Sequence, residues 1–110
     1  MRILICDDDP VFCDELEKGL EQYEITRRLE FEIVKVHSGE AALEALAQGE
    51  WDALFMDIEM PMINGVEAGK RVREQLQNYS LKIIYVSSRR DYAMDLFKVD
   101  TFDFLIKPVA

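Results

Sequence analysis

The chain has 110 residues, of which 49% are hydrophobic, and this length and composition predict one compact domain rather than a disordered segment. Its formal net charge of −9 would repel a phosphate backbone, so we expect no direct binding of nucleic acid by this segment. No apolar run approaches the roughly 20 residues of a membrane span and the N-terminus lacks a signal-peptide pattern, so we expect a cytoplasmic protein without membrane contact.

Short apolar runs alternate with helical stripes along the chain, which predicts strand–helix–strand units wound around a parallel sheet. We expect the first strand at Arg2–Cys6. Asp9 and Pro10 then have the residue types of a helix N-cap and of a first helical position. The helix that follows carries an apolar stripe, which we expect to face the sheet: Phe12, Leu16, Leu20 and Tyr23.

A second strand, a helix and a third strand are predicted in the middle of the chain. Residues 31–36 read as the second strand, and Ser38 is a plausible cap for a helix that ends at Gly49. We expect three apolar residues of this helix to face the core: Ala42, Leu43 and Leu46. Residues 53–57 form a nearly continuous apolar run, as expected for a strand covered by helices on both faces.

The last part of the chain continues the same alternation. Residues 60–65 predict a turn, and a third helix follows it. The inward-facing residues of that helix are expected to be Val66, Val72 and Leu76. Residues 82–88 then predict a fourth strand, residues 91–98 a helix and residues 102–106 a fifth strand. These elements predict an α/β fold with a doubly wound parallel sheet.

Polar residues stand directly at the ends of four predicted strands: Asp7, Asp8, Asp57, Ser87, Ser88 and Lys107. An aspartate at a strand end is usually a cap or a turn residue, and a Lys-Pro pair usually just ends a strand. Caps do not explain why acids, hydroxyls and a lysine occupy four strand ends. Because parallel strands bring their carboxyl ends to one edge of the sheet, we expect these side chains to line one crevice. Asp9 is the exception, and we expect it to cap a helix rather than bind a metal.

Three of these residues would place carboxylates close together: Asp7, Asp8 and Asp57. Two carboxylates about 4 Å apart repel by roughly 4 kcal/mol near a protein surface, and a bound cation, raised pKa values or divergent side chains would relieve this. An oxygen-rich pocket without sulfur or imidazole favours Mg²⁺, with Mn²⁺ as an alternative. Because Mg²⁺ often takes phosphate oxygens as further ligands, the pocket also predicts a phosphoryl ligand. Asp57 is the expected nucleophile if the other two acids hold the metal.

The cysteines and the single histidine are expected to have no chemical role. Cys6 and Cys13 form neither a CxxC pair nor a Cys/His cluster of metal-ligand spacing, so we expect them to pack in the core. His37 follows the second strand without a nearby thiol or hydroxyl partner in the sequence. We therefore expect no catalysis there.

Four stretches of the sequence together resemble the receiver domain of two-component response regulators, over essentially the whole chain. They are "ILICDDDP", "ALFMDIEMPMINGVE", "IIYVSS" and "FDFLIKP", in the order and spacing of that family, and the tail "DYAMDLFKVDTFDFLIKP" is similar to the LytTR-type subset. The resemblance implies a flavodoxin-like, five-stranded sheet in the order 2-1-3-4-5. It also implies a fifth helix, which is missing from this chain. We therefore expect residues 1–110 to be a C-terminally truncated receiver domain, with an effector domain beyond residue 110.

The resemblance implies roles for individual acidic residues. Asp57 resembles the phosphoacceptor, Asp8 a direct Mg²⁺ ligand, and Asp7 its partner acid. Glu59 would give its backbone carbonyl to the metal.

The resemblance also implies a switch. Ser87 resembles the switch hydroxyl, Phe104 the switch aromatic in place of the commoner tyrosine, and Lys107 the lysine that pairs with the phosphoryl group. Glu59 and Arg89 are similar to positions that tune dephosphorylation in the family, and an ion pair between them would shield the aspartyl phosphate from water.

The function implied is a phosphorylation-dependent signalling switch, not an enzyme, with a sensor histidine kinase as donor. A second copy of the chain could bind through the fourth-helix and fifth-strand face, and the effector would regulate transcription by binding DNA.

Two alternatives stay open. In a haloacid dehalogenase-type phosphohydrolase Asp7 of "ICDDD" would be the nucleophile, although that family needs a larger core and a later pair of metal-binding acids. In a non-phosphorylated interaction module, Mg²⁺ would not bind.

Overall fold

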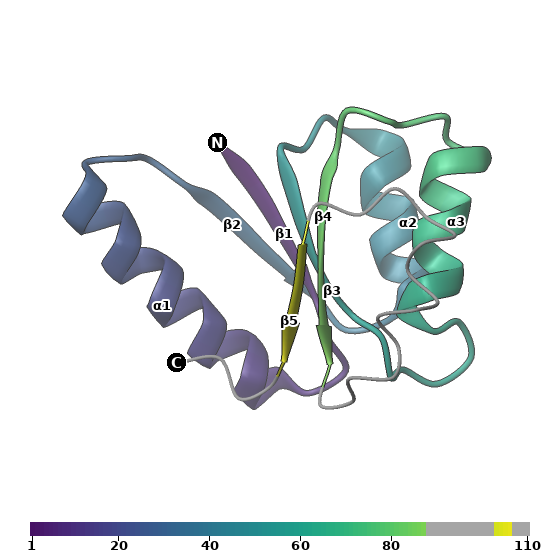
Figure 1. Ribbon diagram of the computed structural model, residues 1–110, viewed down its shortest axis with the longest axis horizontal. Helices are drawn as coiled ribbons and strands as arrows, with labels where there is room; N and C mark the ends of the chain where they lie inside the picture. The colour runs from purple at the N-terminus through teal and green to yellow at the C-terminus, as the bar shows by residue number, and fades with distance from the viewer. Residues whose placement is uncertain (88–102, 107–110) are drawn as a thin grey trace.

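The computed structural model describes residues 1–87 and 103–106, in which five parallel strands form one sheet (Figure 1). The strand order is β2-β1-β3-β4-β5. The strands are β1 (Arg2–Cys6), β2 (Glu32–Val36), β3 (Ala53–Asp57), β4 (Lys82–Ser87) and β5 (Asp103–Ile106). The predicted flavodoxin-like fold and strand order are confirmed. The predicted bounds of β1 and β3 match, and β2 begins one residue later than predicted. The predicted last residue of β4, at position 88, and first residue of β5, at position 102, lie outside the described residues.

Three helices are described, and they cover both faces of the sheet. They are α1 (Pro10–Arg27), α2 (Gly39–Gln48) and α3 (Gly65–Glu74). Figure 1 shows α1 on one face and α2 and α3 together on the other. The helix predicted at 91–98 lies outside the described residues.

Side-chain caps fix where the helices begin. The backbone N–H of Val11 donates to the carboxylate of Asp9 over 3.0 Å, and the N–H of Ala41 donates to the hydroxyl of Ser38 over 3.1 Å. Each such cap typically stabilises a helix by about 1 kcal/mol. Both predicted N-caps are therefore confirmed, as is Gly49 as the C-cap of α2. Asn64 caps α3, which the sequence analysis did not predict.

The core lies in two layers, one on each face of the sheet. Beneath α2 and α3, the predicted residues Ala42, Leu46 and Val72 are buried. Leu43, Val66 and Leu76 are partly buried and pack against the same cluster, although Leu76 lies beyond the end of α3 and not within the helix as predicted. Beneath α1, a second cluster joins Phe12 and Leu16 to apolar residues of β1, and Leu20 packs against it.

The prediction that Tyr23 faces the sheet was wrong, because its side chain is 49% exposed. An 18-residue helix is about 27 Å long, whereas the five-residue β2 spans about 17 Å. The last turns of α1 therefore extend past the sheet. There Tyr23 stacks on Phe31, with 6.5 Å between the ring centroids.

At the amino ends of β1 and β3, the half-buried Trp51 links Arg2 of β1 to helix α2. The guanidinium carbon of Arg2 lies 4.1 Å from the centroid of the Trp51 ring, and the Trp51 indole N–H donates to the carbonyl of Ala45 over 3.1 Å. A cavity of about 660 Å³ adjoins these residues, between the ends of α2 and α3. This edge is opposite to the carboxyl ends of the strands.

Helix α3 packs on β4 at Gly69, where the ring of Tyr85 takes the place of a side chain. Tyr85 is fully buried, and a Cβ atom at position 69 would overlap its hydroxyl oxygen and lie 3.0 Å from Cζ. Among the described residues the Tyr85 hydroxyl has no hydrogen-bond partner, and burial raises the pKa of Tyr85. The close approach of α3 to the sheet therefore requires glycine at this position.

We expect Gly69→Ala to lower the free energy of unfolding by about 1–3 kcal/mol, because the added methyl group overpacks the core. Tyr85→Phe loses no hydrogen bond to a described residue and relieves the worst overlap, so the double variant should recover part of that loss. Urea unfolding followed by circular dichroism measures both values.

Gly19 provides the matched control in an uncrowded helical position. Nothing lies within 4 Å of a Cβ atom built there, so Gly19→Ala should raise stability by about 0.5–1 kcal/mol through helix propensity. Equal effects of alanine at positions 19 and 69 would contradict the packing argument.

Candidate functional site

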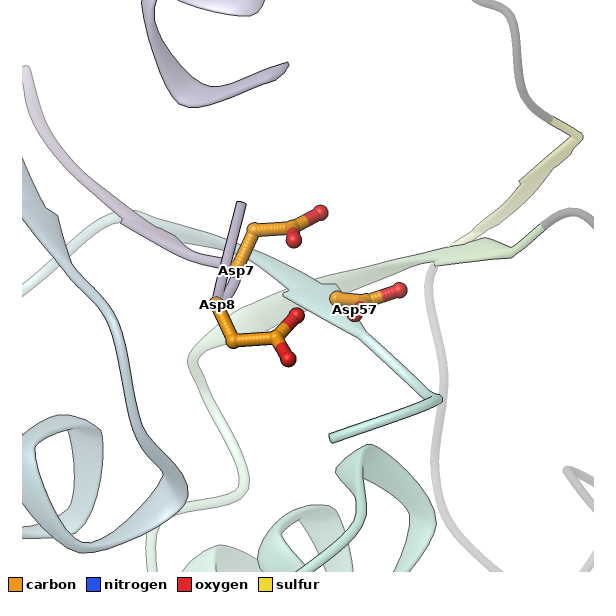
Figure 2. A group of neighbouring side chains, drawn as sticks. All are labelled: Asp7, Asp8 and Asp57. Carbon is orange, nitrogen blue, oxygen red and sulfur yellow. The ribbon is translucent and has the colours of Figure 1, made fainter. Parts of the chain in front are cut away.

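Three acidic side chains meet at the carboxyl ends of β1 and β3 (Figure 2). In the register of these strands Cys6 pairs with Met56, so the residues that follow, Asp7 and Asp57, stand at the same level. Oxygens of Asp7, Asp8 and Asp57 all lie within 4.8 Å of one another. The structure thus brings together the three acids that the sequence analysis assigned to one crevice.

The three carboxylates differ in exposure. Asp7 and Asp57 are 1% and 3% exposed, whereas Asp8 is exposed. Figure 2 shows all three directed toward the same side of the strand ends. Burial of two neighbouring carboxylates is unfavourable unless a cation or hydrogen bonds compensate them. The cluster contains oxygen ligands alone, which fits Mg²⁺ or Mn²⁺ and does not fit zinc.

The loop between β3 and α3 fixes the backbone at the end of β3. The N–H of Ile58 donates to the carbonyl of Val86 on β4 over 3.2 Å, and the N–H of Gly65 donates to the carbonyl of Ile58 over 2.9 Å. A Cβ atom at position 65 would overlap the carbonyl oxygen of Asp57. The glycine therefore allows α3 to begin directly against the residue that carries the carboxylate.

Ser87 lies beside the acids at the end of β4. Asp57 pairs with Val86 in the β3–β4 register, so Ser87 is one position beyond that pair. The Ser87 side chain is fully buried, and its hydroxyl donates to Oε1 of Glu59 over 2.7 Å. The sequence predicted roles for the backbone carbonyl of Glu59 and for an ion pair with Arg89, but not this contact. The spacing of the residues gave no signal for it, because the end of β4 and the loop after β3 meet only in the folded chain.

The remaining predicted site residues contribute no side-chain geometry. Phe104 belongs to β5, where it pairs with Tyr85 of β4, but its side chain is not described. Ser88, Arg89 and Lys107 lie outside the described residues.

His37 has a thiol neighbour, so the prediction that it has none was wrong. Its Nδ1 lies 3.8 Å from Sγ of Cys13 and 2.9 Å from the carbonyl oxygen of Asp7. A contact between Nδ1 and a carbonyl requires the proton on Nδ1, which therefore donates to Asp7. The reason is topological: α1 begins just after the end of β1, and the parallel strand β2 ends beside it, so residues 24 positions apart meet there. This arrangement supports the backbone of Asp7.

Both cysteines are free and buried, as predicted for core residues. Burial, with a smaller contribution from the negative charge of Asp7, raises the pKa of the Cys6 thiol to about 12 and that of Cys13 to about 11. Neither thiol is therefore a nucleophile near neutral pH.

We expect both thiols to resist alkylation by iodoacetamide at about pH 8 in the native protein and to react once guanidinium unfolds it. Mass spectrometry counts the adducts, and rapid labelling of native Cys13 would contradict its burial.

The two thiols also make the stability depend on pH. Because their folded pKa values lie above the ordinary value of 9.0, their contribution to the free energy of unfolding is constant below pH 9 and falls as the pH rises toward 11 to 12.

The family model of the response regulator receiver domain matches residues 3–110 of the chain. The chain belongs to this family. The receiver domain is 30% identical to the sensory transduction protein LytT of Bacillus subtilis over 108 residues, covering 98% of this chain and 42% of LytT. It is 28% identical to the transcriptional regulatory protein LytR of Staphylococcus aureus, with the same coverage. These relatives agree with assignment to the LytTR-type subset.

Solved structures of receiver domains superpose on this one. The response regulator TrrA of Thermotoga maritima, in complex with Mg(2+)-BeF, has 30% identity and a TM-score of 0.80, covering 96% of this chain and 85% of that one. TrrA in complex with the histidine kinase ThkA gives a TM-score of 0.76, over 96% and 84%. The chemotaxis protein CheY4 of Vibrio cholerae, at 21% identity and a TM-score of 0.83 over 99% and 88%, shares the fold.

The receiver domain spans about two fifths of the length of the curated relatives that it matches. No helix within residues 1–87 and 103–106 has both the length and the apolar character needed to cross a bilayer.

Proposed function

We propose that this receiver domain is a phosphorylation-dependent switch in which Asp57 accepts a phosphoryl group from a sensor histidine kinase. The observation that carries the proposal is the meeting of three carboxylates at the strand ends, with a buried hydroxyl beside them on β4. An oxygen of Asp57 attacks the phosphorus atom, and the bond from phosphorus to the imidazole nitrogen of the donor breaks. The nitrogen keeps the electron pair and Asp57 becomes an aspartyl phosphate. The complex of TrrA with a histidine kinase supports such a donor.

Asp7, Asp8 and Asp57 would hold Mg²⁺, or Mn²⁺, together with the backbone carbonyl of Glu59. When bound, the ion would neutralise negative charge on the carboxylates and on the phosphoryl oxygens. The oxygen-only donor set of the described cluster supports this choice of ion, as does the Mg(2+)-BeF bound to TrrA.

Ser87 and Lys107 would bind oxygens of the phosphoryl group, the serine by donating a hydrogen bond and the lysine as a point charge. Phosphorylation would then favour the conformer in which Phe104 turns toward the core, a population shift rather than a new structure. Arg89, with Glu59, would set the lifetime of the aspartyl phosphate.

The outputs of the switch are also proposals. A second copy of the chain would bind through the face formed by the fourth helix and β5, and residues 1–110 would act on a DNA-binding effector domain beyond them. The longer relatives LytT and LytR support an additional domain. Membership of the receiver family favours this cytoplasmic signalling role over the phosphohydrolase, in which Asp7 would be the nucleophile.

We expect incubation with acetyl phosphate and Mg²⁺ to add one phosphoryl group per chain, seen as an increase in intact mass. The adduct should be absent from Asp57→Asn and strongly reduced when the metal is chelated, because the acceptor oxygen or the compensating charge is then missing. Asp7→Asn should slow the reaction without moving its position.

An adduct that persists in Asp57→Asn and disappears in Asp7→Asn would support the phosphohydrolase instead. No adduct in any sample would favour an interaction module that is not phosphorylated.

A further inference from the structure

The side chain of Glu59 has a role that its proposed metal-binding carbonyl does not explain. We propose that Glu59 is a positioning residue whose carboxylate accepts the hydrogen bond of the Ser87 hydroxyl in the unphosphorylated protein. This hydrogen bond must break before the hydroxyl can bind the phosphoryl group on Asp57. The inference rests on the proposed function. The resting state would then be autoinhibited, because the Glu59 carboxylate accepts the hydrogen bond that the Ser87 hydroxyl would otherwise donate to a phosphoryl oxygen.

The Ser87 hydroxyl can donate to only one acceptor at a time. Serine has one O–H donor, so Ser87 cannot donate to Glu59 and to a phosphoryl oxygen at the same time. In the structure this donor is directed at Oε1 of Glu59 over 2.7 Å, a short bond to a charged acceptor. The two acceptors therefore compete for one proton.

The surroundings indicate which partner moves. Ser87 is fully buried and lies in β4, where it pairs with Ile106 of β5. Glu59 is exposed and lies in the loop after β3. The backbone of that loop is held on either side of Glu59, since the N–H groups of Met60 and Gly65 both donate to the carbonyl of Ile58. Movement of the exposed carboxylate would therefore disturb fewer packed atoms than movement of the buried serine or of the loop backbone.

The position of Glu59 also explains how phosphorylation would break the contact. Glu59 is two residues beyond Asp57, and Ser87 lies one position beyond the partner of Asp57 in the β3–β4 register. A dianionic group on Asp57 would therefore repel the carboxylate and attract the hydroxyl proton. Both effects favour exchange of the acceptor.

A simpler role for Glu59 must be separated from this one. Any carboxylate near Asp57 would weaken the binding of an anion by charge repulsion alone, whether or not it touches Ser87. Repulsion would remain after Ser87 is replaced, whereas an effect through the hydroxyl would vanish. A double-mutant cycle between positions 59 and 87 distinguishes the two roles.

The experiment measures the apparent dissociation constant of beryllium fluoride, with saturating Mg²⁺, for the 110-residue chain by ¹⁹F NMR. We expect Glu59→Ala to tighten binding about tenfold in the presence of Ser87, because a hydrogen bond to a charged group no longer has to be broken. In the Ser87→Ala background the same replacement should change the constant by less than twofold. Glu59→Asp keeps the charge but shortens the side chain, so it should also tighten binding.

Two controls accompany the cycle. Glu44→Gln, at an exposed position on α2, removes one negative charge away from the site and should leave the constant unchanged. Thermal unfolding confirms that each variant is folded. NMR also detects the hydrogen bond between Ser87 and Glu59 without any ligand. The ¹³Cβ chemical shift of Ser87 should change in Glu59→Ala and not in Glu44→Gln.

Equal tightening by Glu59→Ala in both backgrounds would overturn the proposal in favour of repulsion, and so would an unchanged constant or an unchanged Ser87 shift. If the wild-type chain binds no more beryllium fluoride than Asp57→Asn, the proposed function fails and this inference fails with it. Specific binding by the wild type that is insensitive to Glu59 would remove the inference alone.

Discussion

The parallel register of β1, β3 and β4 is the constraint on which the site depends. Cys6 pairs with Met56, and Asp57 pairs with Val86, so the strands end at one level. Side chains alternate between the two faces of a strand, and a slip of one residue would exchange the side chains of β3 between the two core layers and disrupt the packing of both. The core that fixes this register therefore also fixes the distance between the acids. Packing far from the site determines its geometry.

That geometry opposes stability. Asp7 and Asp57 are almost fully buried and have oxygens close to each other and to Asp8, whereas two carboxylates about 4 Å apart repel by roughly 4 kcal/mol near a protein surface. The N–H of Asp9 donates to Oδ1 of Asp7 over 2.9 Å, and the hydrophobic layers on both faces of the sheet also offset this cost. A fold selected for stability alone would not group acids here, and such local conflicts are typical of functional sites. Binding of a cation would relieve the repulsion, which links the stability of the domain to its ligands.

The sequence predicted those features that depend on local chemistry or on periodicity. The strands were found because their apolar runs are short and uniform, and Asp9 and Ser38 were found because capping requires specific side chains. Side-chain contacts between segments far apart in the sequence were not predictable. The approach of Cys13 to His37, and of Ser87 to Glu59, depends on side-chain directions that only the folded chain sets. The orientation of Tyr23 was predicted wrongly because periodicity identifies the face of a helix but not where the sheet beneath it ends.

The position of Trp51 has a consequence for spectroscopy. It is the single tryptophan of the chain, and it lies with Arg2 at the amino ends of the strands, at the edge opposite to Asp57. Its fluorescence therefore reports on the packing of that remote edge and is not quenched directly by events among the acids. A change in emission on phosphorylation would measure a rearrangement transmitted along the whole length of the sheet. A silent tryptophan would indicate that the rearrangement is confined to the carboxyl ends of the strands.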